Sequence, residues 1–395
     1  MAMVVALLLL AGGVSAFVVD GGDTPSVSFE GRTIVVSPDQ PPPTLPGLDG
    51  EVAAALPEIM RVVQDKRGLL FKKPVRVTLL GDAAFRARLK ETSESDEEDR
   101  EELKTAERVL QAYGLLDRGV DLDKATEALL GDAVVGFYDT EKDDLVVRGE
   151  KLTPYVRSTF AHELTHALQD QWFDLDREDI EDRDDEASQA FTAVIEGDAV
   201  RVEQLYLDTL PPEQQKQAEM EELSAGGGIS ADIPRILFEL IGFPYAIGPT
   251  FVTEVVANGG QARLDEAFRN PPTTTEEILH PEVFLAGEKP KAVKNPEPDK
   301  GKKAIDQGVL GEYGFLLVLG RLLDLQDALP AVQGWGGDRY VAWRDGDRTC
   351  ARTNLVMDTT EDAREMRAAL VAAAKERDEI KVGAVGEVLT FTSCG

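Results

Sequence analysis

The chain of 395 residues has few of several chemically useful residues: 3 histidines, 2 cysteines, and 42 lysines and arginines against 73 acidic residues. Its net charge of −31 at pH 7 argues against nucleic acid or an anionic membrane surface as a partner, because both repel an acidic protein. The cysteines, Cys350 and Cys394, are too far apart in sequence for a Cys-x-x-Cys zinc or redox site. With 43% hydrophobic residues, the chain is typical of a soluble globular protein of two or three packed units.

Residues 1–19 carry no charge, and they resemble an export signal with an apolar centre at 7–10 and small residues at 14–16. No lysine or arginine precedes the apolar run, so an uncleaved single N-terminal membrane anchor stays open as the alternative. No other stretch reads as long and apolar enough to span a bilayer. We therefore expect an extracellular or cell-surface protein in which Cys350 and Cys394 form a structural disulfide.

Two of the three histidines stand four residues apart, in the sequence His162-Glu163-Leu164-Thr165-His166. Thr153, followed by a proline, is a good start for a helix over 154–171 that carries both histidines. Residues i and i+4 share a helix face, so both imidazoles can reach one metal ion. Glu163 lies beside them and can act on a water bound to that metal. The motif indicates a zinc hydrolase.

A catalytic zinc takes three protein ligands and keeps one position open. The best third ligand is Glu196, which lies in an apolar setting on a second predicted helix over 187–210. Two antiparallel helices joined by a loop can bring its carboxylate alongside the imidazoles, and Gly197 would let backbones approach. The remaining histidine, His280, precedes a proline on an extended segment and is a poorer ligand candidate.

This pattern resembles the gluzincin zinc metallopeptidases, and in particular little-characterised exported bacterial members of that clan. The resemblance is carried by residues 161–171 (AHELTHALQDQ), 196–199, 274–281 (TTEEILHP) and 334–338. It is specific around the active site and softer over 134–340. It implies an α+β fold with a zincin-like metallopeptidase core, in which a small sheet lies above the motif helix, a helical half lies below it, and a cleft separates them.

Carried over to this sequence, the resemblance assigns His162, His166 and Glu196 as ligands of Zn2+ and Glu163 as the general base of peptide-bond hydrolysis. Other divalent ions fit the same ligands. The partner would be a peptide or protein substrate, and a strand at 134–138 could pair with it as an additional strand.

Two supporting roles stay open. Many gluzincins have an aspartate that orients a zinc-bound imidazole, but this chain has Val200 at that position. Asp198 points to another side of the helix, so the alternatives are Asp170, Asp185 and Glu203. His280 could donate a hydrogen bond to the oxyanion of the transition state. The competitors for that role are Tyr138, Tyr245, Tyr313 and Tyr340.

The pattern along the chain predicts an α+β organisation in five segments. These are a signal peptide or membrane anchor (1–19), a proline-rich linker (20–48), an N-terminal α/β part of the catalytic unit (49–152), its helical zinc-binding part (153–325) and a C-terminal α+β unit with the disulfide (326–395). Separate helices are expected at 233–240 and 250–257. The region 91–113 could be a pro-segment.

Two other functions compete with an exported zinc metallopeptidase. A zinc-binding scaffold or binding protein that cuts no peptide would explain the ligands but not Glu163, because a structural zinc needs no base beside it. A fortuitous motif on a solvent-facing helix would leave the Glu196 carboxylate more than about 8 Å from the imidazole nitrogens. The sequence reveals no oligomeric state.

Overall fold

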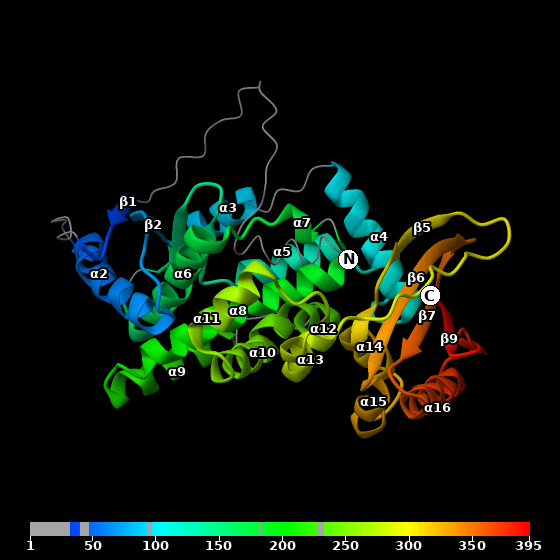
Figure 1. Ribbon diagram of the computed structural model, residues 1–395. Coiled ribbons are helices and arrows are strands. Elements are labelled where there is room, and N and C mark those ends of the chain that lie inside the picture. Colours follow the sequence, from blue (N-terminus) through cyan, green and yellow to red (C-terminus); the bar gives the residue numbers. More distant parts are fainter. Residues whose placement is uncertain (1–31, 40–46, 93–96, 150, 182, 227–232) are drawn as a thin grey trace.

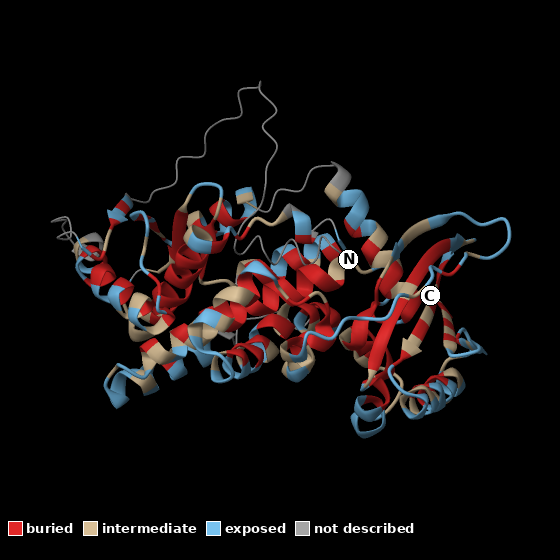
Figure 2. Cartoon of the chain, in the orientation of Figure 1, coloured by how far each residue is buried: buried red, intermediate tan, exposed pale blue. Residues whose placement is uncertain are grey.

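The computed structural model describes residues 32–39, 47–92, 97–149, 151–181, 183–226 and 233–395, and the predicted leader at 1–19 lies outside them. The fold is α+β, as the sequence predicts. A four-stranded sheet lies at one end, a five-stranded sheet at the other, and helices fill the space between them (Figure 1). Buried side chains run through this helical middle and line both sheets (Figure 2).

The first sheet has the strand order β1-β2-β4-β3. Its strands are β1 (Arg32–Val36), β2 (Val75–Leu80), β3 (Gly136–Asp139) and β4 (Asp144–Arg148). β2 pairs parallel with β4, whereas β1 and β3 pair antiparallel with their neighbours, so β3 forms one edge. The predicted linker at 20–48 is corrected in part, because it contains the strand β1. Ile34 and Val36 of this strand are buried, and helix α2 (Gly47–Arg67) packs on it.

Three helices precede β3: α3 (Asp82–Thr92), α4 (Glu97–Tyr113) and α5 (Leu122–Ala133). α4 packs against the second sheet, where the hydroxyls of Tyr113 and Thr353 lie 2.8 Å apart and the Tyr113 ring stacks on Phe391. Tyr113 is 1% exposed. If residues 91–113 were removed as a pro-segment, a face of the second sheet would therefore be uncovered.

The histidine motif lies on α6 (Pro154–Phe173), which packs against β3 and β4. The Thr153 side chain caps this helix by accepting a hydrogen bond from the Val156 amide. After the short α7 (Glu178–Glu181), α8 (Asp185–Leu207) packs against α6. Asp184 caps α8 by accepting from the Ala187 amide. Both long helices thus begin with the local signals that favour a helix start.

A single helix, α10 (Arg235–Ala257), replaces the two helices predicted around Pro244. Pro244 has no amide hydrogen to donate to the Leu240 carbonyl. The side chain of Gln189 on α8 donates to that oxygen instead, at 3.0 Å, so the helix continues. α10 crosses α8 at two glycines, since a Cβ at Gly197 would lie 2.3 Å from the carbonyl carbon of Gly248. Gly197 therefore allows the close approach of α10. The expected neighbour was the motif helix α6.

α10 is also the one helix within the described ranges whose length and apolar composition would suffice to cross a membrane. This corrects the expectation that no stretch other than residues 1–19 is long and apolar enough to span a bilayer. Its most apolar window is 44% buried inside the protein, and the helix packs closely on α8. A core helix of a globular protein has the same features.

The remaining helices of the middle are α9 (Pro212–Gly226), α11 (Gly260–Arg269), α12 (Thr275–Leu279) and α13 (Pro281–Ala286). The second sheet has the order β5-β6-β7-β9-β8. Its strands are β5 (Ala304–Gly308), β6 (Trp335–Asp345), β7 (Arg348–Met357), β8 (Lys381–Val385) and β9 (Val388–Cys394), with the helices α14 (Gly311–Leu319), α15 (Leu325–Val332) and α16 (Thr360–Glu376). The sheet thus begins with β5, before the boundary predicted at 326.

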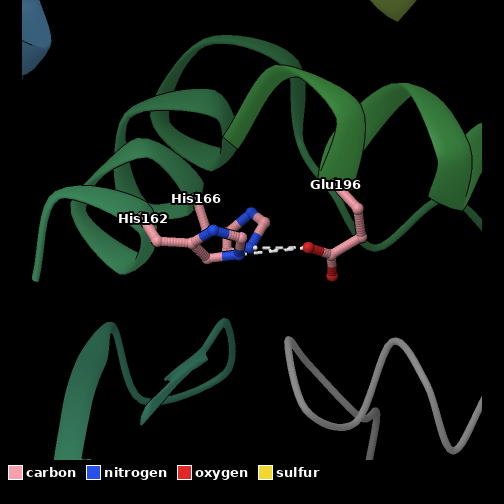
Figure 3. A group of neighbouring side chains, drawn as sticks. All are labelled: His162, His166 and Glu196. Atoms are coloured by element: carbon pink, nitrogen blue, oxygen red, sulfur yellow. Dashed lines mark hydrogen bonds and ion pairs between the residues drawn. The ribbon is translucent and has the colours of Figure 1, made fainter. Parts of the chain in front are cut away.

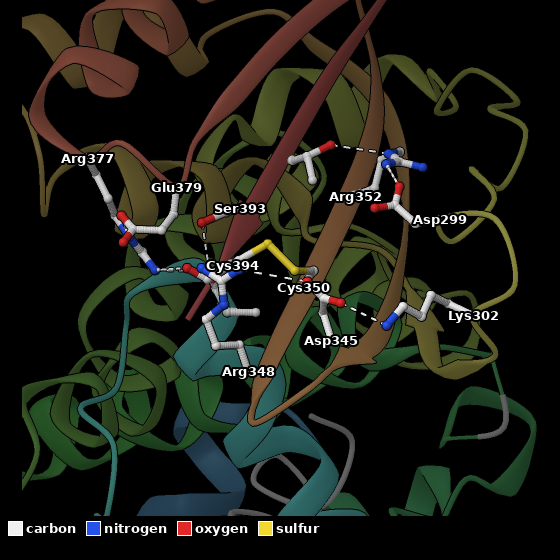
Figure 4. The surroundings of a disulfide bond; sticks show 12 residues. Asp299, Lys302, Asp345, Arg348, Cys350, Arg352, Arg377, Glu379, Ser393 and Cys394 are labelled. Carbon is white, nitrogen blue, oxygen red and sulfur yellow. Dashed lines mark hydrogen bonds and ion pairs between the residues drawn. A yellow bond between two sulfur atoms is a disulfide. The ribbon is translucent and has the colours of Figure 1, made fainter.

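The predicted disulfide between Cys350 and Cys394 is confirmed (Figure 4). The two residues lie opposite each other on β7 and β9, so strand pairing brings the sulfur atoms together. The Arg377 side chain donates to the Cys394 carbonyl at 2.6 Å and ties the last strand to the end of α16.

Candidate metal centre

His162 and His166 on α6 and Glu196 on α8 point toward one another (Figure 3). Glu196 Oε2 lies 3.1 Å from His162 Nε2 and 3.4 Å from His166 Nε2. One ligand atom from each residue lies within 4.8 Å of the others, and across the described residues no other group of three meets this criterion. The separation of more than about 8 Å that a fortuitous motif predicts is not observed.

The charges within this triad are mutually dependent. Burial disfavours the imidazolium form, but hydrogen bonds to Glu196 and Glu203 outweigh it and raise the pKa of His162. The pKa of His166 rises for the same reason, mainly because of Glu196. Conversely, the histidines hold the pKa of Glu196 well below its ordinary value despite its burial. Because metal ligands must give up their protons, any metal binding at this triad would depend on pH.

Glu163 is 6% exposed, and its Oε2 atom has no hydrogen-bond partner among the described residues. Burial raises its pKa to about 7. Its side chain lies against Gly136 of β3, where an added Cβ would be 3.1 Å from Glu163 Cγ. A glycine at this point of the edge strand therefore leaves room for the carboxylate. A divalent cation in the triad would favour the ionised form of Glu163.

Of the three predicted orienting acids, the structure brings only Glu203 to a histidine. Its Oε2 lies 3.1 Å from His162 Nδ1. Asp170 instead accepts from the Tyr138 hydroxyl at 3.1 Å. Asp185 lines a separate cavity of about 580 Å3 between α4, β5 and the start of α8, and no triad residue lines that cavity.

The partner of His166 is a residue that sequence analysis missed. Gln169 Oε1 lies 3.0 Å from His166 Nδ1, and the Gln169 side chain is fully buried. The spacing i+3 on the motif helix is compatible with this contact, but many helical glutamines share it. Only the packing of α8 against α6 selects this side-chain direction.

His280 lies outside the centre, which corrects its predicted role as an oxyanion donor. Its Nε2 is 3.0 Å from Glu312 Oε1 on α14, and its Nδ1 is 3.8 Å from Glu282. Its ring nitrogens therefore contact acids near the C-terminal sheet and not the triad. The sequence could not show this, because it gives no distance between the 274–281 segment and α6.

Among the four competing tyrosines, Tyr245 on α10 is the one beside the triad. Its ring lies nearly parallel to that of His162, with centroids 6.3 Å apart. The surrounding protein and the carboxylates of Glu196 and Glu163 raise the pKa of Tyr245, so the hydroxyl keeps its proton. The hydroxyls of the other three bond elsewhere, to Asp143 and Asp170 (Tyr138), the Glu239 carbonyl (Tyr313) and Asp306 (Tyr340).

Comparison with known proteins reaches only the C-terminal part of the chain. Residues 300–393 match a family described as a domain of unknown function (DUF8575). These residues include the second sheet from β5 onward, together with α14, α15 and α16, and lie outside the histidine motif. No curated protein and no solved structure matches the chain. The case for a function therefore rests on the chemistry of the centre.

Proposed function

We propose that this chain is an exported zinc-dependent metallopeptidase with a zincin-like core. The observation that carries the proposal is the convergence of His162, His166 and Glu196 beside a buried Glu163 whose Oε2 atom is unpartnered. Two imidazole nitrogens and one carboxylate oxygen suit zinc and leave one tetrahedral position open. A structural zinc site is typically closed by four ligands and needs no base.

The arrangement around the centre supports the same proposal. The small sheet lies on one side of α6, and α8 and α10 form the helical half. The outer edge of β3 has no strand partner within the described residues and could bind an extended peptide by antiparallel pairing. The disulfide suits an oxidising compartment, and this agrees with the export signal or membrane anchor expected at 1–19.

Zinc held by these residues supplies a Lewis acid and lowers the pKa of a water to about 7. Glu163 Oε2 accepts the proton of the attacking water and then delivers it to the nitrogen of the leaving amine. The Tyr245 hydroxyl, which keeps its proton, donates a hydrogen bond to the oxygen on which negative charge develops. Glu203 accepts from His162 Nδ1 and directs its Nε2 toward the centre.

The test is cleavage of a diverse peptide library by the zinc-loaded protein, followed by mass spectrometry. We expect cuts by the wild type and a loss of about 10^2- to 10^4-fold in rate for Glu163→Gln, with zinc still bound. Glu213→Gln, an exposed change on α9, is the matched control and should keep its rate. Stoichiometric zinc without any cuts would instead indicate a non-catalytic zinc scaffold. A protein that binds no zinc would overturn both readings.

A further inference from the structure

The two histidines of the centre have different supports. His162 Nδ1 faces the carboxylate of Glu203, whose side chain is 23% exposed. His166 Nδ1 faces the amide of Gln169, which is fully buried. A carboxylate can only accept a hydrogen bond, whereas an amide can accept or donate, depending on which way it is turned. The orientation of the Gln169 amide therefore decides which ring nitrogen of His166 carries the hydrogen.

That orientation is fixed by two acceptors. Gln169 Nε2 lies 3.1 Å from the Ile195 carbonyl oxygen and 3.1 Å from Asp198 Oδ2. An amide oxygen turned toward these atoms would leave oxygen facing oxygen with no hydrogen between them. Oε1 must therefore face His166, where it can only accept. It follows that in the neutral ring His166 Nδ1 carries the hydrogen, and Nε2 keeps its lone pair for a metal.

Asp198 is itself held rigidly by two guanidinium groups. Arg67 Nε lies 2.6 Å from Asp198 Oδ2, and Arg201 Nη2 lies 2.9 Å from Oδ1. The side chains of Arg67 and Asp198 are both 0% exposed. The Arg67 guanidinium also lies 5.5 Å from the ring centroids of Phe173 and Phe268, which restrict its movement. The pair thus connects the end of α2 to α8 beside the centre.

We propose that Gln169 is a positioning residue, which selects the Nδ1–H tautomer of His166 and directs its Nε2 toward the metal. The buried pair of Arg67 and Asp198 in turn fixes Gln169. This inference rests on the proposed metal site, and it adds a relay of three residues that no ligand motif contains. It explains how the centre orients His166 although the chain has Val200 where an orienting aspartate would stand.

The test compares Gln169→Met with Gln171→Met on the same helix. Both changes remove amide hydrogen bonds, but the Gln171 side chain bonds to the backbone of Lys72 and Lys73 and not to a histidine. Zinc affinity is measured by competition with a chelator. We expect the dissociation constant to rise by about 10- to 100-fold for Gln169→Met and to change little for Gln171→Met.

A second readout shows whether an acceptor holds the ring N–H of His166 against exchange with solvent. Proton NMR of the cobalt-loaded protein shows the exchangeable N–H of each metal-bound imidazole as a shifted signal. We expect two such signals in the wild type and in Gln171→Met, and loss of the His166 signal through solvent exchange in Gln169→Met. Gln169→Glu should keep both, because a protonated carboxyl group can donate to Asp198 and still accept from His166.

The outcomes separate the two proposals. A wild type that binds neither zinc nor cobalt would overturn the metal site and this inference together. A wild type that binds metal but lacks the His166 N–H signal would show that Gln169 does not hold this hydrogen, and would overturn this inference alone, even if Gln169→Met did not fold. Unchanged affinity and two remaining signals in a folded Gln169→Met would overturn the role of Gln169 while leaving the metallopeptidase proposal intact.

Discussion

Two buried acidic networks lie along α8, one at Glu186 at the start of the helix and one at Asp198 farther along it, and they are stabilised in different ways. Near the metal centre, Asp198 faces two guanidinium groups, those of Arg67 and Arg201. Arg67 also lies 2.8 Å from Asp265. Each of these carboxylates therefore has a cation within hydrogen-bond distance, and the network is ionic although it is buried.

The second network joins the helical middle to the C-terminal sheet, and we call it the joint. It consists of four buried carboxylates, Glu186, Glu276, Glu312 and Asp338. Their hydrogen-bond donors are mostly neutral. Glu186 accepts from the Thr275 amide at 2.7 Å, and Asp338 accepts from the amides of Leu310 and Gly311 and from the Trp335 indole. Glu312 faces the imidazole of His280.

This difference predicts opposite responses to pH. Burial disfavours ionised Asp198, but Arg67 and Arg201 outweigh it and lower its pKa, so its stabilising effect is lost as the pH falls. In the joint, burial raises the pKa of Asp338 to about 6 and that of Glu276 to about 8. A folded state that binds extra protons loses stability as the pH rises. The joint should therefore loosen first in alkali, and the surroundings of the metal centre in acid.

The largest effect should follow from breaking the ionic network. Arg67→Met leaves Asp198 buried without its closest cation, and we expect a loss of about 3–5 kcal/mol in the free energy of unfolding. Urea denaturation at pH 7 measures it. The matched control is Arg364→Met, which removes an exposed pair with Glu361 and should change the free energy of unfolding far less, because solvent screens such a pair.

Equal losses in the two arginine variants would contradict the comparison. They would mean that Asp198 finds other partners or takes up a proton when Arg67 is absent. Zinc affinity is the second measurement on a folded Arg67→Met. It should fall, because the inferred relay to His166 requires a fixed Asp198.

A smaller effect should follow from a change in the joint. His280→Leu leaves the Glu312 carboxylate, which is 2% exposed, without its imidazole partner, and its Oε2 atom already lacks one among the described residues. We expect a loss of about 1–3 kcal/mol in the free energy of unfolding. Zinc affinity should stay unchanged, because His280 contacts no member of the triad.

His280→Gln is the matched variant, since its amide can still donate to Glu312, and it should recover part of the lost stability. If a folded His280→Leu variant lost much of its zinc affinity or its Glu163-dependent cleavage, His280 would have a role in the proposed metal centre after all. The stabilising contact of His280 should weaken as the pH rises, because the hydrogen bond to Glu312 raises its pKa.

The features that sequence reasoning predicted depend on local spacing. The i, i+4 histidines, the Thr153 cap and the approach of Glu196 follow from helix geometry and from one short connection. The disulfide follows from an even cysteine count in a chain whose uncharged residues 1–19 predict export. Each of these requires only neighbouring residues or one pairing.

The features that were missed depend on contacts between distant segments. Pro244 reads as a helix break until Gln189 supplies the donor that the proline lacks. β1 is five residues long beside a proline-rich stretch, and only its pairing with β2 identifies it as a strand. His280 lies in the segment 274–281, which resembles the metallopeptidase family in sequence. That resemblance does not show how far His280 lies from the triad. Tertiary contacts decide such cases.

The prediction that most sharpens the comparison concerns Glu276. Its folded pKa of about 8 reflects burial first and then the carboxylates of Glu312, Asp358 and Glu277, against which His280 acts. Between the ordinary pKa of 4.5 and about 8, the folded state holds a proton that the unfolded state has released. Each pH unit in that window should cost up to about 1.4 kcal/mol of stability.

Glu276→Gln removes this dependence. The stability of the variant in thermal unfolding should therefore match that of the wild type near pH 5 and exceed it near pH 9. Glu387→Gln, an exposed change in the turn between β8 and β9, should leave the slope unchanged. A Glu276→Gln profile parallel to the wild type would show that the joint is not the alkali-sensitive network.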